Sequence, residues 1–489
     1  MPGLALALLL AAADLPSQAR LEAAAQEAIA GSCPQRPVAL DPDLTAGARA
    51  FAAAASAGLT EVTGSALSFY ASLESSEPSP VAGVATVSPP SQADRAVGEL
   101  FPRSCRFNRI GVAAALMPGG EAVVAALTAQ HDTDLAPIAG SVAAGDSVEV
   151  SGRLAPGLGA PRLFVTRPGG QVEELKLATS GDRFSARVTL RPAGEHSLEI
   201  LADGAGGPQV LALRRVFAGV DPPTRPPAAR PGSAPAAGDG LSTVEAEIDR
   251  LRAGRGLPHL HRDAQLDAVA EGHSREMART RTFAHVLASD GSLTDRLRKA
   301  GYAYRSAGEN IGLSEDAVSA HEAVAGSPAH LANLLDPRHR RLGLGAARGL
   351  SPDGAQVLYL TEVLAAPVIG SPDPAGEALA LIAQERSRRK LPALARSADL
   401  DAVARRAIAR VALADALKLP PGVTAEALES EPTLKSVVGE LFVGSAPDEA
   451  KTSHNLAEAR WTRVGVGAIY ASSRTYGPGR LWVLVLYAN

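Results

Sequence analysis

The stretch SPAHLANLL at residues 327–335 decides how its part of the chain folds. A serine followed by a proline predicts the start of a helix, because serine caps a free backbone N–H and proline is tolerated at the first helical position. His330 then falls in the first helical turn, where the positive end of the helix dipole disfavours a protonated imidazole. A neutral imidazole is the form that a metal ion or a proton-transfer step requires.

Two shorter motifs precede this stretch, FAH at residues 283–285 and GENI at residues 308–311. Gly308 is expected to allow a tight backbone loop that presents Glu309, and Asn310 to hold that loop by local hydrogen bonds. Although loops and helices separate them in the sequence, His285, Glu309 and His330 could converge on one pocket.

Three interpretations of His285, Glu309 and His330 remain open. Two imidazoles and a carboxylate are compatible with a divalent metal, zinc first. The second interpretation is a general acid–base pair. This interpretation lacks an evident nucleophile, because Ser327 is expected to cap the helix. The third is a structural network in which the glutamate bridges the two histidines.

The other polar residues of this region carry weaker predictions. His273 lies on an apolar helical stripe and is expected to be a satisfied, partly buried histidine that lines the cleft together with Ser327. His321 and His339 are expected at surface or loop positions, and Glu362 faces either the cavity or solvent.

The surrounding region, residues 241–366, alternates helices and strands and is repeated by residues 376–489. Residues 20–130 carry a third, fainter copy, so three copies of one domain are predicted. The matching glycine-rich signatures are RIGVA at 109–113, RLGLG at 341–345 and RVGVG at 463–467. The position of His273 is Phe51 in the first copy and Ala407 in the third, and only the middle copy has the full polar set.

Between the first two copies, residues 134–218 show period-two alternation with regular turn clusters. This pattern is typical of an antiparallel all-β sandwich, and it predicts an immunoglobulin-like domain without evident chemistry. Residues 219–240 are rich in proline, alanine and glycine and are predicted to be a linker.

The N-terminus has an apolar run at residues 4–13, which suits the core of a signal segment spanning residues 1–19 but is too short to span a membrane. Export is therefore expected, and no later segment predicts a transmembrane helix. The two cysteines, Cys33 and Cys105, would then pair and stabilise their domain by about 4 kcal/mol. Two buried free thiols are the alternative.

Length and charge narrow the class of protein. A chain of 489 residues predicts several domains. The net charge of −4, with both signs interspersed, gives no basic footprint for nucleic acid. The sequence also has no phosphate-binding glycine loop ahead of a helix, which argues against a nucleotide-dependent enzyme.

Taken in order, these motifs resemble the CAP superfamily of cysteine-rich secretory, antigen 5 and pathogenesis-related proteins, in its bacterial SCP-like branch. The resemblance implies an α/β fold, an α–β–α sandwich with a central antiparallel sheet. It also implies a cleft with two histidines and two acidic residues that can hold zinc. His285, Glu309 and His330 match three of these four positions. The fourth position, a glutamate in animal members, is Ser327 in this chain. The family commonly has an aromatic residue three positions before it, where this chain has Val324.

The resemblance implies a secreted protein that binds a lipid, a glycan or another protein. The leading expectation is therefore an exported, non-enzymatic binding protein with a divalent metal in the middle cleft. A metal-dependent hydrolase, with His285 and His330 as ligands and Glu309 as base, is the alternative. A cell-envelope scaffold in which the three copies pack together is the third candidate.

Overall fold

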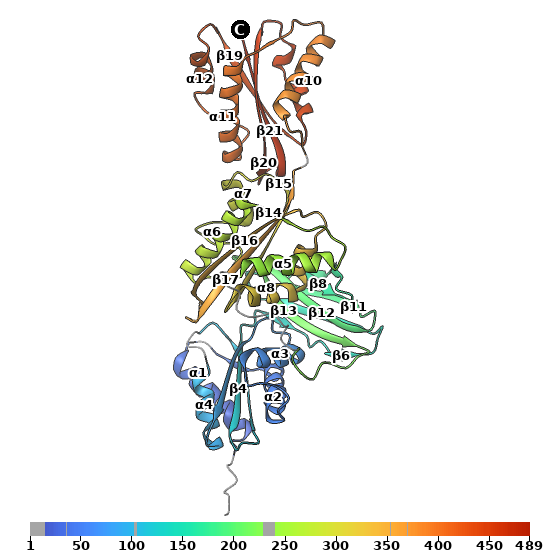
Figure 1. Cartoon of the computed structure of the whole chain (residues 1–489), viewed down its shortest axis with the longest axis vertical. Coiled ribbons are helices and arrows are strands. Elements are labelled where there is room, and N and C mark those ends of the chain that lie inside the picture. Colours follow the sequence, from blue (N-terminus) through green and yellow to red (C-terminus); the bar gives the residue numbers. More distant parts are fainter. Residues whose placement is uncertain (1–14, 36, 102–104, 228–239, 353, 369) are drawn as a thin grey trace, which may run out of the picture. The chain divides into compact units, whose positions relative to one another are not determined.

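The structure, a computed structural model, describes residues 15–489 except residues 36, 102–104, 228–239, 353 and 369 (Figure 1). Most of the predicted signal segment and much of the predicted linker lie outside the described residues. The chain divides into two compact units, which are described separately. The first contains Met1–Ala237, Ala323–Ala332 and Leu350–Gln356, and the second contains Gly238–Glu322, Asn333–Gly349 and Val357–Asn489. None of the described helices is both long and apolar enough to cross a bilayer.

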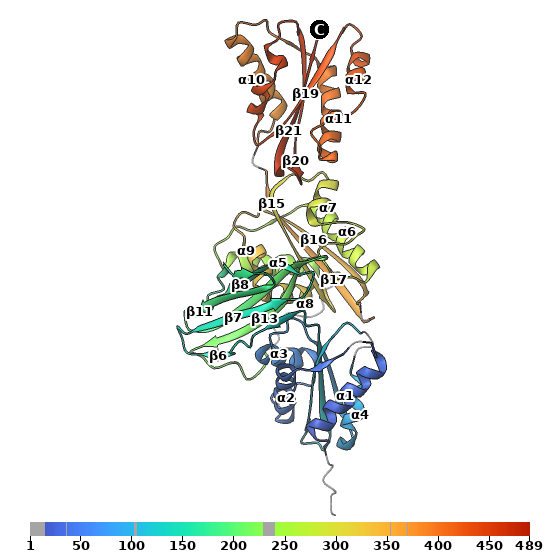
Figure 2. The ribbon, with the colours of Figure 1, turned by 180° about the vertical axis from the view of Figure 1, so that it is seen from behind.

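The N-terminal module, in the first unit, is a four-stranded sheet between two layers of helices (Figures 1 and 2). Odd-numbered residues of β4 from 123 to 127 pack with α2 and α3, whereas even-numbered residues from 122 to 126 pack with α1 and α4. This alternation builds an α–β–α sandwich. The elements are α1 (Gln18–Ser32), β1 (Ala39–Leu40), α2 (Pro42–Ser56), α3 (Gly64–Glu74), β2 (Val81–Val87), η1 (Pro90–Gln92), α4 (Ala93–Glu99), β3 (Arg109–Leu116) and β4 (Ala122–Ala129).

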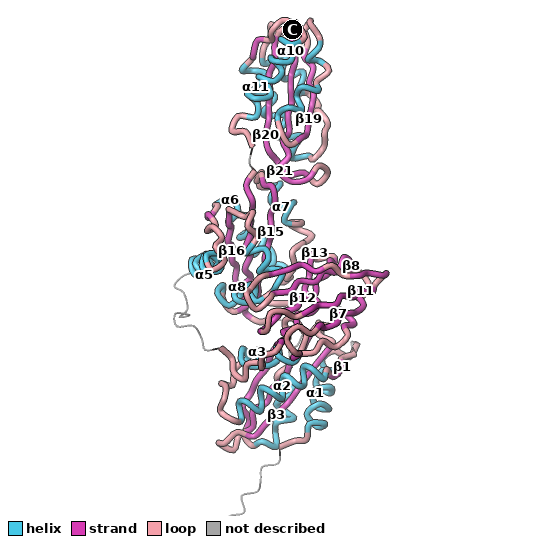
Figure 3. The backbone as a smooth tube through the Cα atoms, turned by 90° about the vertical axis from the view of Figure 1, so that its right-hand side faces the viewer, coloured by secondary structure: helices cyan, strands magenta, loops and turns pink. Residues whose placement is uncertain are grey.

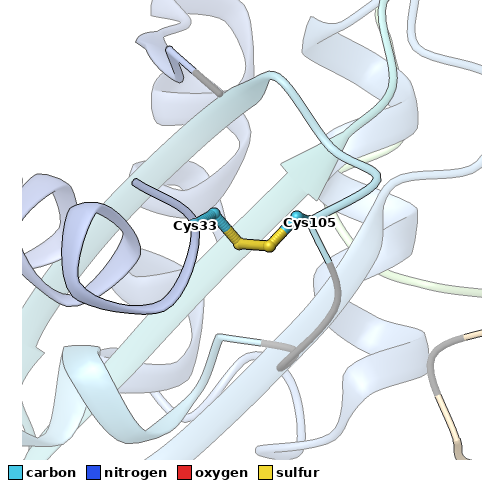
Figure 4. Close-up of a disulfide and its surroundings, with 2 residues drawn as sticks. All are labelled: Cys33 and Cys105. Carbon is cyan, nitrogen blue, oxygen red and sulfur yellow. A yellow bond between two sulfur atoms is a disulfide. The ribbon is translucent and has the colours of Figure 1, made fainter. Parts of the chain in front are cut away.

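One disulfide joins Cys33, the residue that ends α1, to Cys105 before β3 (Figure 4). The two Cα atoms are 5.5 Å apart, and the cysteines are separated by 72 residues in the sequence. Neither cysteine is a free thiol. The bridge therefore ties the end of the first helix to the segment that leads into β3, the strand against which this helix packs.

A β-sandwich follows, also in the first unit, and Figure 3 shows it as a helix-free run of strands. One sheet has the order β10-β11-β7-β5 and the other β6-β13-β12-β8-β9, and they enclose one apolar core. Its immunoglobulin-like nature stays a prediction. The strands are β5 (Thr133–Leu135), β6 (Ser141–Val142), β7 (Ser147–Leu154), β8 (Gly159–Thr166), β9 (Val172–Leu175), β10 (Ala178–Ser180), β11 (Arg183–Thr189), β12 (Gly194–Gly204) and β13 (Gly207–Ala218).

The middle module runs from Leu241 to Pro367, and its sheet has the order β14-β16-β17-β15. Its α6 and α7 pack on one face of that sheet through Leu266, Leu297 and Val363. The elements are α5 (Leu241–Ala253), β14 (His261–Arg262), α6 (Ala264–Thr280), α7 (Leu293–Lys299), β15 (Tyr304–Ser314), α8 (Ala317–Gly326), α9 (Pro328–Leu335), β16 (Arg341–Leu350) and β17 (Gln356–Pro367).

The loop predicted around Gly308 is wrong, because residues 308–311 lie inside strand β15 and pair with β17. Glycine serves close packing here and not a turn. A Cβ at Gly308 would lie 3.0 Å from the side-chain oxygen of Asn333. Glu309 is therefore presented by the regular alternation of a strand, which is more rigid than a loop.

The C-terminal module completes the second unit with a sheet of order β18-β20-β21-β19. Two apolar clusters cover its faces, one under α11 and α12 and the other under α10. The elements are α10 (Pro374–Arg388), β18 (Ala395–Arg396), α11 (Ala398–Ala414), α12 (Val423–Ser430), β19 (Val437–Gly444), η2 (Pro447–Thr452), η3 (Asn455–Ala457), β20 (Arg463–Ser473) and β21 (Gly477–Ala488).

The three modules share one strand order, in which a two-residue strand pairs in parallel with the second long strand of the module. The long strands pair antiparallel in the N-terminal and C-terminal modules, as do β15 and β17 in the middle module. The predicted antiparallel sheet is thus mixed at this edge. A glycine of each repeated signature lies against the helix that follows the two-residue strand, which is α2, α6 or α11. A Cβ at Gly111, Gly343 or Gly465 would come within 2.3 Å of that helix. This close contact explains why the signature requires glycine.

Candidate functional site

Glu309 of β15 is the centre of a buried ionic cluster in the second unit. His285 Nδ1 lies 3.0 Å from Glu309 Oε1, and the Arg296 guanidinium donates to Glu309 Oε2. His273 Nε2 lies 3.9 Å from Oε1. The structure thus brings together two of the three predicted metal ligands, with His273 beside them. We call His273, His285, Asp290, Arg296 and Glu309 the Glu309 cluster.

Arg296 reaches Glu309 because the start of α7 is fixed locally. Ser292 and Asp295 form a capping box at that start, which satisfies free backbone N–H groups. The Arg296 side chain also donates to the carbonyls of Gly291, at 2.7 Å, and His285, at 3.2 Å. The same cation therefore holds the Glu309 carboxylate and the backbone of His285. The sequence interpretation did not single out Arg296, although the capping box was a readable signal.

His273 of α6 is completely buried and has polar partners on both sides of its ring. Its Nδ1 lies 2.7 Å from Asp290, and its Nε2 lies 3.1 Å from the carbonyl of Ala284. Asp290 also lies 3.5 Å from Arg296. His273 therefore links the helix to the segment that carries His285.

The electrostatics of the cluster favour an ionised Glu309. Burial alone would raise the pKa of this carboxyl group. The hydrogen bond from His285 and the positive charge of Arg296 outweigh burial, with smaller effects of the His285 and His273 charges, and lower the pKa below its ordinary value. The side chain is 4% exposed, whereas those of His285 and Asp290 are 16% and 20% exposed, so these two members are partly open to solvent.

A second buried cluster surrounds Glu362 of β17. His321 Nδ1 lies 2.6 Å from Glu362 Oε1, and Asn310 donates to Oε2 at 3.1 Å. Asn333 donates in turn to Asn310 at 3.0 Å. We call these four residues the Glu362 cluster. His321 lies in helix α8 and is buried, so the surface or loop position predicted for it is wrong. His339 lies in the loop between α9 and β16, as predicted, but it is buried. No sequence motif marked His321, because its partner Glu362 lies on the distant strand β17.

Arg252 of α5 fixes the end of α9 in the same unit. Its guanidinium donates to the carbonyls of Leu334, Asp336 and His339. Arg386 of the C-terminal module does the same with Leu456 and Glu458. Both guanidiniums are buried, and each satisfies carbonyls left free at a helix end.

The other predicted site residues, Ser327 and His330, lie in segment Ala323–Ala332 of the first unit. Ser327 Oγ is 3.5 Å from the backbone nitrogen of His330, which is at the limit of a capping bond. The hydroxyl instead donates to Glu199 of the β-sandwich at 2.6 Å. Glu199 was absent from the sequence interpretation, because nothing in the sandwich suggested chemistry.

A separate surface pocket of about 390 Å³ lies elsewhere in the second unit. Arg305, Tyr470 and Arg480 are among its lining residues. It contains none of the predicted site residues, so we do not include it in the candidate site.

With this geometry in place, comparisons with known proteins identify the domain to which the Glu309 cluster belongs. The model of the cysteine-rich secretory protein family, CAP, matches residues 246–360. These residues form a CAP domain, as the motifs predicted. The match covers the middle module, including His273, His285, Glu309 and His330.

Three solved structures illustrate the likeness. An outer surface protein of Borrelia burgdorferi is 20% identical, with 26% of this chain and 92% of that chain covered and a TM-score of 0.23. An extracellular SCP-domain protein of Bacillus anthracis is 21% identical, with 39% and 66% covered and a TM-score of 0.23. A cysteine-rich secretory protein of Staphylococcus aureus is 14% identical, with 45% and 75% covered and a TM-score of 0.21. No curated protein matched the sequence.

Proposed function

We propose that this chain is an extracytoplasmic, non-enzymatic binding protein whose middle CAP domain carries the ligand site for a lipid, a glycan or a protein. The observation that carries the proposal is the buried polar set of the middle module. The C-terminal module forms the same sheet with Ala407 at the position of His273 and an apolar cluster around it. Burying charged groups costs free energy, so a set that the fold does not need points to a function.

The exposed part of the site supports binding. His285 is, with Asp290, one of the two partly exposed members of the Glu309 cluster, and Phe283, two residues before His285, is 40% exposed. An exposed aromatic ring two residues from a partly exposed imidazole offers apolar contact and a hydrogen bond to a ligand. The buried cluster beneath holds His285 in one orientation.

The same geometry argues against hydrolysis. Both oxygens of Glu309 are engaged, one by His285 and one by Arg296, so neither is free to take a proton from water. Ser327 and Glu199 resemble a nucleophile and a base, but both are buried. A substrate would have to displace this packing before it could react.

A divalent ion at His285, Glu309 and His330 stays a prediction, and the donor set fits it poorly. The Arg296 guanidinium holds Glu309 Oε2, and a cation would compete with it for the carboxylate. No group of three or more histidine, cysteine, aspartate or glutamate side chains in the described part of the chain is placed to hold a metal. Metal analysis of the wild type and the His285→Ala/His330→Ala variant tests this prediction, and equal metal contents would contradict it.

The proposed function is tested by co-sedimentation of the full chain with phospholipid vesicles and with isolated cell-wall glycan, and by cross-linking capture of proteins at the cell surface. We expect one of these ligands to be retained by the wild type and lost in His285→Ala. His454→Ala, an exposed histidine of the C-terminal module, is the matched control and should bind normally.

Two results would overturn the proposal. Turnover of peptide or ester substrates that is lost in Glu309→Gln, with fold and binding intact, would show a hydrolase. Equal ligand retention by the wild type and His285→Ala, or retention by neither, would leave the scaffold as the better account.

A further inference from the structure

Glu199 is a buried carboxylate in an unexpected place. It lies on β12 between Leu198 and Ile200, which point into the core of the β-sandwich. Because side chains alternate along a strand, Glu199 points out of that core. Its side chain is nevertheless completely buried. Another part of the first unit must therefore cover it.

The covering part is segment Ala323–Ala332, which contains the first turn of α9. Ser327 Oγ donates to Glu199 Oε1 at 2.6 Å, and the backbone N–H of Ala329 donates to Glu199 Oε2 at 2.6 Å. The first backbone N–H groups of a helix have no partner within it, and the helix dipole favours an anion there. Glu199 thus serves as the cap of α9, 130 residues away in sequence from Ala329.

Among the described residues, no basic side chain is paired with this carboxylate. The residues opposite Glu199 on the neighbouring strands are Phe164 and Leu213, and the one titratable side chain among residues 323–332 is that of His330. Burial raises the pKa of Glu199 to about 7, although the hydrogen bonds from Ser327 and Ala329 oppose this rise. In the described part of the chain, these two donors are the groups that offset its burial. The carboxylate therefore depends on the helix turn, and the turn depends on the carboxylate.

We propose that Glu199 is an intrachain cap by which the β-sandwich holds the first turn of α9 and sets the position of His330. The β-sandwich is then a control element for this segment and not a passive spacer. One part of this inference rests on the proposed function, namely that His330 has a role in the ligand site. The cap itself stands on contacts that need no ligand.

Hydrogen–deuterium exchange of the ligand-free full chain tests the cap. In Glu199→Gln, one acceptor oxygen is replaced by an NH₂ group that faces a donor. We expect the amides of residues 329–331 to exchange at least about tenfold faster, which corresponds to 1.4 kcal/mol. Glu195→Gln is the matched control, because Glu195 lies on the same strand and pairs with Arg215 at the surface. It should leave this segment unchanged.

Ser327→Ala tests the cap from the other side and guards against a variant that fails to fold. It removes one of the two donors, so we expect a smaller acceleration in the same peptides. The double variant should exchange no faster than Glu199→Gln alone, since both changes break one interaction. Unchanged exchange in folded Glu199→Gln, or effects that simply add, would overturn the proposal. Because the readout needs no ligand, failure of the proposed binding function would leave this result intact.

Discussion

The middle and C-terminal modules have the same strand order and the same buried arginine at the end of α5 or α10. They differ in how polar their buried side chains are. The middle module buries two clusters of histidines and carboxylates. At the position of His273 the C-terminal module has Ala407, within an apolar cluster that includes Trp482. Topology and shared contacts thus suffice for the fold. Of these two modules, the middle one alone buries such histidine–carboxylate clusters among the described residues.

Among the tests of this difference between the two modules, replacing Arg296 is expected to change stability the most. In Arg296→Met, the buried Glu309 loses its cation, and we expect a loss of about 3–5 kcal/mol in the stability of the middle module. Urea-dependent hydrogen exchange of the full chain measures this module by module. Arg275→Met, which removes an exposed pair with Glu271, should cost less than about 1 kcal/mol. A similar small loss in both variants would show that the Glu309 cluster is not held by its charges.

A smaller effect is expected for the feature that the two modules share. Arg252→Met and Arg386→Met each leave buried carbonyls without donors, which costs about 1–3 kcal/mol or more. The same exchange experiment should find the two losses equal within about 1 kcal/mol, each confined to its own module. A clear inequality would contradict the view that the copies are built alike.

Acid should affect the middle module through Glu309. Its pKa is lower in the folded state than in the unfolded state, so its ionisation contributes stability above the ordinary carboxyl pKa. That contribution is lost as pH falls through the lower, folded value. Denaturation between pH 7 and pH 3 should therefore show a difference between wild type and Glu309→Gln that narrows at the acid end. A difference independent of pH would contradict the assigned charge state.

The smallest effect is expected when the middle module is made more like the C-terminal one. Replacing the whole pair in His321→Leu/Glu362→Leu removes both buried polar groups, so stability should change by less than about 1 kcal/mol or rise. Glu362→Leu alone leaves His321 and Asn310 without an acceptor and should cost about 1–3 kcal/mol. Urea denaturation compares the two. A double variant worse than the single one would show that this fold requires the cluster.

Much of the local structure was readable from the sequence. Ser327 and Pro328 mark the start of α9, and the glycines of the repeated signatures mark close contact between sheet and helix. The motif order gave the CAP domain. The strand around Gly308 was mistaken for a loop, because glycine can serve either a turn or close packing and a local pattern does not separate them.

By itself the sequence determined the family of the middle module and the repeated signatures. It also suggested, as a hypothesis, that His285 lies close to Glu309. Only the tertiary structure decided the partners of these groups: Arg296 on Glu309, His321 on Glu362 and Glu199 on α9. The physical reason is that backbone propensity and capping act over a few residues, whereas the compensation of a buried charge comes from whichever distant side chain the packed fold places against it.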